Sequence, residues 1–140
     1  MTLTEIEVYC LTKNGAYLDW PFGPEFPVIK VKAPSRVKAP SQEKGRIFAQ
    51  PFILREEPKV TLNCDMMMGD LYRTIYPGIV TRGYHCPPVQ QPYFNTVNLD
   101  CTVPDDVLIE MIEHAYTVVV RKLPKRYQIE LEDSAQDTCL

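Results

Sequence analysis

PDDVLIEMIEHAYTVVVRKLP, residues 104–124, carries the strongest helical pattern in the chain. Its apolar residues recur every three or four positions, as in a helix with one face in a core; they are Leu108, Met111, Ile112, Ala115 and Val119. Pro104 stands in the first turn, and the acids Asp105 and Asp106 suit the positive end of the helix dipole. Pro124 stops the pattern. A long amphipathic helix of this kind must pack on a second layer.

Two shorter helices are predicted upstream of it. Overlapping capping boxes, Thr-x-x-Glu, begin a helix over about Thr4–Lys13, which Gly15 ends. Asp65 can cap a second helix that runs to about Tyr76. The apolar residues of this second helix recur at helical spacing and are Met67, Met68, Leu71 and Ile75.

The segments between the helices favour strands. Four of them are β-prone and bounded by proline or charge: Phe26–Lys32, Arg46–Leu54, Lys59–Leu62 and Tyr93–Leu99. Helices at both ends with antiparallel strands between them predict an α+β two-layer sandwich, in which the helices pack on one face of the sheet. We expect a single domain over residues 1–127 and an acidic, partly disordered tail over residues 128–140.

Composition limits the function further. The chain has 140 residues, a net charge of −3 and no long apolar run, so we expect a soluble protein without a membrane partner, with a monomer favoured. Its five cysteines are widely spaced and form no CxxC pair, which favours reduced thiols in the cytoplasm over a disulfide framework. An acidic balance argues against general binding of polyanions.

Catalytic motifs are missing from the sequence. There is no phosphate-binding loop, HExxH or GxSxG, so we expect no enzyme activity, no catalytic residue and no cofactor. His85 and Cys86 are adjacent, and Cys64 or Cys101 could join them in a metal site or an activated thiol. Ordinary core burial of these cysteines is the favoured alternative, so no metal is predicted. His114, beside the apolar stripe of the last helix, is predicted to be packed and hydrogen-bonded.

The segment from Val28 to Arg46 is strongly basic. It holds a single acid, Glu43, against six bases: Lys30, Lys32, Arg36, Lys38, Lys44 and Arg46. Inside it, the pentapeptide VKAPS occurs at residues 31–35 and again at 37–41, and two prolines make a long hairpin loop the simplest reading. Such a hairpin can lay lysines along phosphates, or its lysines can simply keep an exposed hairpin soluble.

The chain resembles the YjbR/MmcQ-like family over nearly all of Leu3–Leu123. The resemblance rests on the order and spacing of short motifs: YCL at 9–11, Tyr17 with WPFGP at 20–24, FPVIKV at 26–31, RIFA at 46–49, LNCD at 62–65, LYR at 71–73, YPGI at 76–79, GYH at 83–85, NTV at 95–97 and IEHAY at 112–116 running into two valines.

This resemblance implies a frataxin-like α+β sandwich and, because members are described as double-wing DNA-binding proteins, double-stranded DNA as the partner. The sequence departs from the family pattern at two places. CPPVQQPYF follows Tyr84 and His85, with Phe94 where the family has tryptophan, and Asn63 stands where it usually has lysine. Both departures remove bases that could contact phosphates.

Two functions are favoured, both of them non-enzymatic binding; an enzyme comes third and would need Tyr84, His85 and Asn95 in proximity. In the first, DNA is bound through the basic hairpin described above. In the second, a protein or small ligand is bound by the aromatic, proline-rich loops at residues 20–26 and 84–94, for which the candidate contacts are Trp20, Tyr84, His85, Phe94 and Asn95. A continuous positive face would favour DNA, whereas an apolar cleft beside neutral loops would favour the ligand.

Overall fold

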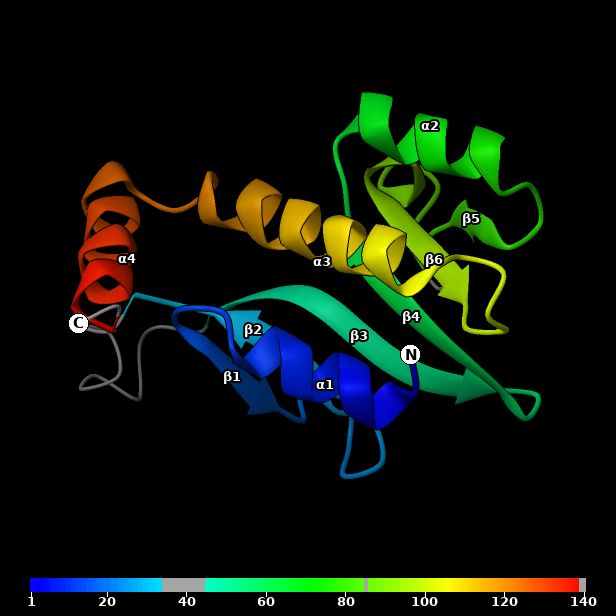
Figure 1. Cartoon of the computed structure of the whole chain (residues 1–140), viewed down its shortest axis with the longest axis horizontal. Helices are drawn as coiled ribbons and strands as arrows, with labels where there is room; N and C mark the ends of the chain where they lie inside the picture. The colour runs from blue at the N-terminus through cyan, green and yellow to red at the C-terminus, as the bar shows by residue number, and fades with distance from the viewer. Residues whose placement is uncertain (34–44, 85, 139–140) are drawn as a thin grey trace.

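A computed structural model of the chain describes residues 1–33, 45–84 and 86–138, with side chains described as far as residue 133. The whole second VKAPS copy, residues 37–41, lies outside these ranges, as do the last two residues of the first copy and His85. Among the described residues, no helix is both long and apolar enough to cross a bilayer. Helices lie in front of one antiparallel sheet (Figure 1).

The sheet has six strands in the order β1-β2-β3-β4-β6-β5, and every neighbouring pair is antiparallel. Their bounds are β1 Ala16–Asp19, β2 Val28–Val31, β3 Arg46–Leu54, β4 Glu57–Asn63, β5 Val80–Arg82 and β6 Phe94–Asn98. The four predicted strands are confirmed as β2, β3, β4 and β6. The short outer strands β1 and β5 were not predicted.

A bulge in β3 sets which side chains face the helices. Ile29 pairs with Ala49 and Lys30 with Ile47, so Phe48 is an extra residue on β3. Phe48 and Ala49 are both buried in the core. Beyond the bulge the alternation resumes, which turns Gln50 to the face opposite the core, the same face as Ile47.

Helices α1 (Leu3–Leu11) and α3 (Asp105–Val120) cover the core face of the sheet. The predicted capping box at the first helix is confirmed, since Thr2 and Glu5 exchange hydrogen bonds of 3.1 and 3.0 Å. All five residues of the predicted stripe on α3 are buried. The two-layer α+β sandwich is thereby confirmed.

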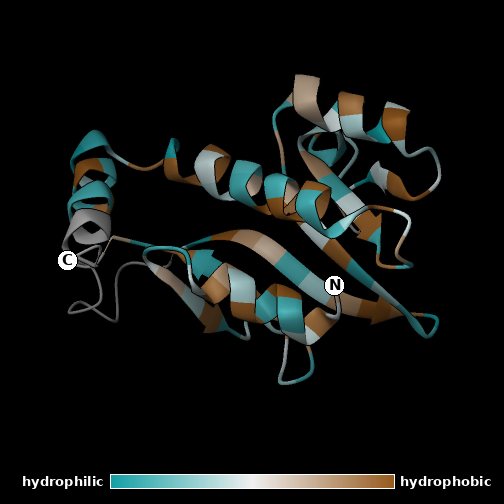
Figure 2. Cartoon of the chain, viewed as in Figure 1, coloured by the Kyte–Doolittle hydropathy of each residue, from teal (hydrophilic) through white to brown (hydrophobic). Residues whose placement is uncertain are grey.

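Helix α2 (Met66–Ile75) begins at its predicted cap, where the Asp65 carboxylate accepts a hydrogen bond from the Met68 backbone at 2.7 Å. Its inner contacts come from Gly69 and Tyr72, which are buried. Three residues of the predicted apolar stripe lie outside instead, and Figure 2 shows brown, hydrophobic residues on this helix: the exposed ones include Met67, Leu71 and Ile75. Spacing identified the helix, but not the face that packs.

Helix α4 spans Lys125–Thr138, in the segment over residues 128–140 for which we expected a partly disordered tail. Pro124 opens this helix by accepting hydrogen bonds from the backbones of Tyr127 and Gln128. Tyr127 and Leu131 are buried, and Asn14 donates a hydrogen bond to the Leu131 carbonyl. The helix forms because the side chains of Tyr127 and Leu131 pack on the end of the sheet. The mostly polar sequence of this segment does not indicate that contact.

Candidate functional site

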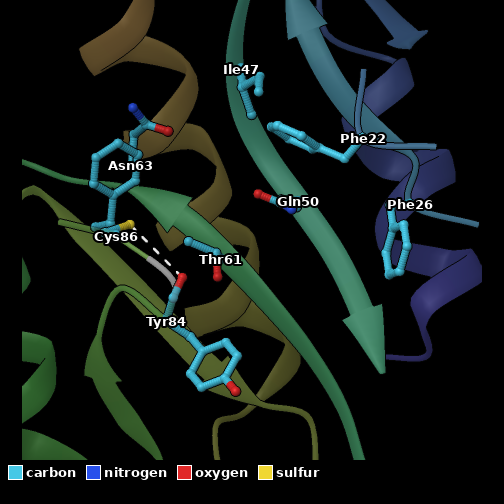
Figure 3. Close-up of a pocket in the computed structure, with 9 residues that line it drawn as sticks. Phe22, Phe26, Ile47, Gln50, Thr61, Asn63, Tyr84 and Cys86 are labelled. Atoms are coloured by element: carbon cyan, nitrogen blue, oxygen red, sulfur yellow. Dashed lines mark hydrogen bonds between the residues drawn. The ribbon is translucent and has the colours of Figure 1, made fainter. Parts of the chain in front are cut away.

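A cleft of about 470 Å³ opens on the face of the sheet opposite α1 and α3 (Figure 3). Its base is made by β3 and β4, and its sides by the loop at residues 20–27 and the loop at residues 83–93. The nine lining residues define what we call the aromatic cleft: Phe22, Phe26, Ile47, Gln50, Thr61, Asn63, Tyr84, Cys86 and Phe94. Its volume suits a small molecule.

Hydrogen-bonding side chains form the base of the cleft. Gln50 and Thr61 are directly opposed in the β3/β4 pair. The Thr61 hydroxyl lies 2.8 Å from that of Thr96, which also accepts a hydrogen bond from the Tyr84 backbone at 2.9 Å. This chain ties the loop at residues 83–93 to the sheet and fixes one side of the cleft.

Asn63 is the least expected residue of the base. It is only 7% exposed, and its side-chain amide has no hydrogen-bond partner among the residues that the structure describes. A side-chain amide offers both N–H donors and a carbonyl acceptor, and here the described chain occupies neither. Such a group at the base of a cleft is available to a ligand.

Aromatic side chains line both sides of the cleft. Phe22 and Phe26 are 60% and 48% exposed, although phenylalanine is ordinarily buried. Opposite them, the Tyr84 ring stacks on Phe52 with centroids 6.1 Å apart and planes at 15°. In Figure 3, Gln50 and Thr61 lie between the two phenylalanines and Tyr84. The arrangement suits a flat ring held between aromatic side chains.

The described lining of the cleft is uncharged, since it includes no Asp, Glu, Lys or Arg. Burial raises the pKa of the Cys86 thiol, which keeps this thiol protonated and weakly nucleophilic at neutral pH. A charged ligand would therefore lose its hydration without gaining an opposite charge.

A second hollow, of about 840 Å³, lies between α1, α3 and α4. Lys13, Arg121 and Glu132 are among its lining residues, so it is a charged groove and differs in kind from the aromatic cleft. It provides a reference region for binding experiments.

Both candidate ligand loops contribute residues to one cleft, but their candidate contacts differ in position. Tyr84 and Phe94 line the cleft, Trp20 is exposed outside it, and His85 lies outside the described residues. Asn95 is a correction: it is 1% exposed, accepts a hydrogen bond from Arg73 at 2.6 Å and donates one to the Gly69 carbonyl. It is a structural residue on the core face.

Sequence reasoning missed the residues of the cleft base. Asn63 drew notice only because a lysine was expected there, and Gln50 and Thr61 carry no motif. The alternation of β3 and β4 placed them on one face, but only the packing of the two loops makes that face concave.

The basic hairpin is described only at its base, where Lys30 corrects the prediction. Its side chain is 7% exposed, and its ammonium pairs with Asp19 at 2.6 Å, so it is not free to contact phosphate. The Lys32 ammonium lies 4.6 Å from the centre of the Tyr17 ring, and Arg46 is exposed at the start of β3. Arg36, Lys38 and Lys44 lie outside the described residues.

His114 is packed and hydrogen-bonded, as predicted: its Nε2 accepts a hydrogen bond from the Asp65 backbone at 3.1 Å. The Cys64 thiol is buried and donates to the Pro92 carbonyl at 3.7 Å. Over the described ranges, no three His, Cys, Asp or Glu side chains gather as a metal site would need. The proposed grouping with His85 lies partly outside those ranges.

Cysteine reactivity is expected to follow burial. Cys10, Cys64, Cys86 and Cys101 are free, and Cys101 is the exposed one. Burial raises the pKa of Cys10 to about 12 and that of Cys64 to about 11, so these two thiols should react slowest with a disulfide reagent in the native protein. In denaturant without reductant, all five thiols of the chain should react. Fewer than five would contradict the prediction.

The fold and the site define a small α+β protein with an uncharged, ligand-sized cleft between two loops. The chain belongs to the YjbR family, whose family model matches residues 11–118. It is 32% identical over 111 residues to the uncharacterized protein YbdF of Escherichia coli O157:H7, a match that covers 79% of this chain and 78% of that one.

Solved structures agree with this assignment. The crystal structure of the Deinococcus radiodurans protein DR2400, a DUF419 domain, matches with a TM-score of 0.78 and 27% identity, covering 94% of this chain and 88% of that one. A Pseudomonas syringae protein matches with a TM-score of 0.63 and 14% identity, covering 85% and 99%, and supports the fold alone.

Proposed function

We propose that this protein is a non-enzymatic binding protein that holds a small, uncharged ligand with a flat aromatic part in the aromatic cleft. The observation that carries the proposal is the buried, unpartnered amide of Asn63 at the base of that cleft. A ligand in the cleft can hydrogen-bond to this amide without breaking a hydrogen bond among the described residues. The exposed rings of Phe22 and Phe26 supply the apolar contact area.

Binding without catalysis is proposed because the described lining offers no group suited to acid, base or nucleophilic chemistry. Its oxygen and nitrogen groups are neutral amides and hydroxyls, and its thiol is protonated. A small ligand is favoured over a protein partner because the surface is a concave cavity of about 470 Å³. The free thiols of the described cysteines support a cytoplasmic location.

DNA binding through the basic hairpin has less support. Of the three hairpin bases that the structure describes, Lys30 is neutralised by Asp19 and Lys32 lies against Tyr17, which leaves Arg46 exposed. If duplex DNA were the partner, its affinity would fall steeply with salt, by about 0.9 in log–log slope for each phosphate contacted. DNA bound at the basic hairpin would also make no contact with the aromatic cleft.

A titration followed by amide NMR distinguishes the two functions. Indole, a neutral aromatic probe, is expected to shift the resonances of Ile47, Gln50 and Thr61, while residues of the charged groove such as Asn14 stay unchanged. A DNA duplex at roughly 50 mM salt, where electrostatic binding is strong, is expected to cause no comparable shifts. Shifts from the duplex around Lys32 and Arg46, with none from indole in the cleft, would overturn the proposal.

A matched pair of variants in one loop checks the site. Phe22→Ala is expected to weaken indole binding about tenfold, because it removes one aromatic side of the cleft. Trp20→Ala removes a larger exposed ring from the same loop but outside the cleft, and should leave the affinity unchanged. Equal effects of the two changes would show that indole binds elsewhere.

A further inference from the structure

We propose that the ligand presents a hydrogen-bond donor beside an acceptor on one edge of a flat ring, as a cyclic amide or a nucleobase-like ring does, and that Asn63 and Gln50 recognise this edge. The inference rests on the proposed function and names its ligand class. It is carried by the kind, number and position of the unpartnered polar groups in the cleft.

The two carboxamides lie close together on one face of the sheet. Gln50 is paired with Thr61, and Asn63 lies two residues further along the same strand. Diagonal neighbours of this kind are about 7–8 Å apart across antiparallel strands, so a ring that enters between them can be reached by both side chains. Neither side-chain amide is hydrogen-bonded within the part of the chain that the structure describes.

A carboxamide offers both an N–H donor and a carbonyl acceptor, so its full partner is a group that also offers both. A lactam edge, with N–H beside C=O, pairs with a carboxamide through two hydrogen bonds. A carboxylate would satisfy only the donors, and an ammonium only the acceptor. Either ion would also be buried without an opposite charge, because the described lining holds none.

The aromatic sides impose the flat shape. Phe22 and Phe26 face Tyr84 across the base, so the space between them accepts a ring in stacked or edge-to-face contact (Figure 3). Thr61 adds little discrimination, since its hydroxyl is already hydrogen-bonded to Thr96. The ring supplies affinity, and the amide edge supplies selectivity.

Three probes of nearly the same shape test the inference by calorimetry or NMR titration. Isoquinolin-1(2H)-one carries the donor–acceptor edge, its N-methyl derivative lacks the donor, and naphthalene lacks both groups. The lactam is expected to bind at least about tenfold more tightly than either of the others. Equal affinities overturn the inference and leave the proposed function standing, whereas no binding of any probe overturns both.

Variants assign the selectivity to residues. Asn63→Leu keeps the number and branching of the side-chain heavy atoms but removes the amide, so the three probes should bind with similar affinities. It should leave the thermal midpoint nearly unchanged, because the Asn63 amide has no hydrogen bond to lose among the described residues. Phe22→Ala is the control and should weaken all three probes by the same factor. A lowered thermal midpoint for Asn63→Leu would show that the amide is needed for folding. In that case Gln50→Leu, a change at a half-buried position, tests the selectivity for the lactam by itself. Preserved lactam selectivity in both leucine variants contradicts the inference.

Discussion

Replacing Ile112 by aspartate is expected to unfold the domain. Ile112 is fully buried in the core, on the face of α3 that packs against the sheet. A carboxylate there has no partner, and burying it costs at least about 4–5 kcal/mol. That cost approaches the entire stability of a small domain, which is about 5–15 kcal/mol. Circular dichroism should show the loss of cooperative melting.

The control for this change must come from the outer face of the same helix. Glu113 lies on that face but is unsuitable, because its carboxylate accepts hydrogen bonds from the Tyr9 hydroxyl on α1 and from the Lys13 ammonium just after that helix. Burial alone would raise the pKa of Glu113, but these hydrogen bonds outweigh it and hold the pKa below its usual value. Thr117 is exposed, so Thr117→Asp should change stability by no more than about 0.5 kcal/mol.

A graded variant covers the case in which the aspartate protein cannot be purified. Ile112→Ala should lower the free energy of unfolding by about 2–5 kcal/mol in chemical denaturation. If Ile112→Asp melts like the parent protein, α3 faces the sheet with a different side.

Replacing Gly15 by alanine is expected to lower the free energy of unfolding by about 3 kcal/mol, for two separate reasons. Gly15 has φ +77°, a left-handed conformation that costs other residues about 1–2 kcal/mol. An added Cβ would also lie 2.4 Å from the Lys32 carbonyl oxygen and 2.6 Å from Leu131 Cδ2. The carbonyl belongs to the backbone, and Lys32 in turn donates a hydrogen bond to the Gly15 carbonyl at 3.1 Å, so neither side can yield easily.

Gly78 offers a matched control because it has nearly the same backbone conformation, φ +80°, with no atom within 4 Å of an added Cβ. Gly78→Ala should therefore cost only the conformational part, about 1 kcal/mol. The difference between the two variants in urea denaturation measures the close approach of β2 and α4 to Gly15. Equal costs would mean that neither the Lys32 carbonyl nor Leu131 crowds this turn.

Most elements of the fold follow from local sequence. Capping residues and 3.6-residue spacing predicted α1, α2 and α3, and β-prone segments predicted the four strands that include the whole central part of the sheet. The outer strands β1 and β5, of four and three residues, were missed. So short a strand has almost no pattern of its own and exists because a neighbouring strand pairs with it.

The candidate site depended much more on tertiary structure. The sequence indicated two aromatic loops and an uncharged Asn63, and it predicted a ligand at those loops as one of two open functions. It also assigned Lys30 to a phosphate contact and Asn95 to the ligand. Both side chains are buried and bound to residues distant in sequence. Lys30 forms an ion pair with Asp19, and Asn95 accepts a hydrogen bond from Arg73.

The sequence by itself determined the class of fold, because helix caps and hydrophobic periodicity act between residues a few positions apart. Only the tertiary structure decided which side chains are available to a partner. Phe22 and Tyr84 are 62 positions apart, and they lie on opposite sides of Gln50 and Thr61 because antiparallel pairing brings their loops to one face of the sheet (Figure 3). A side chain can contact a partner only if its neighbours in space leave it accessible, and those neighbours come from the whole chain.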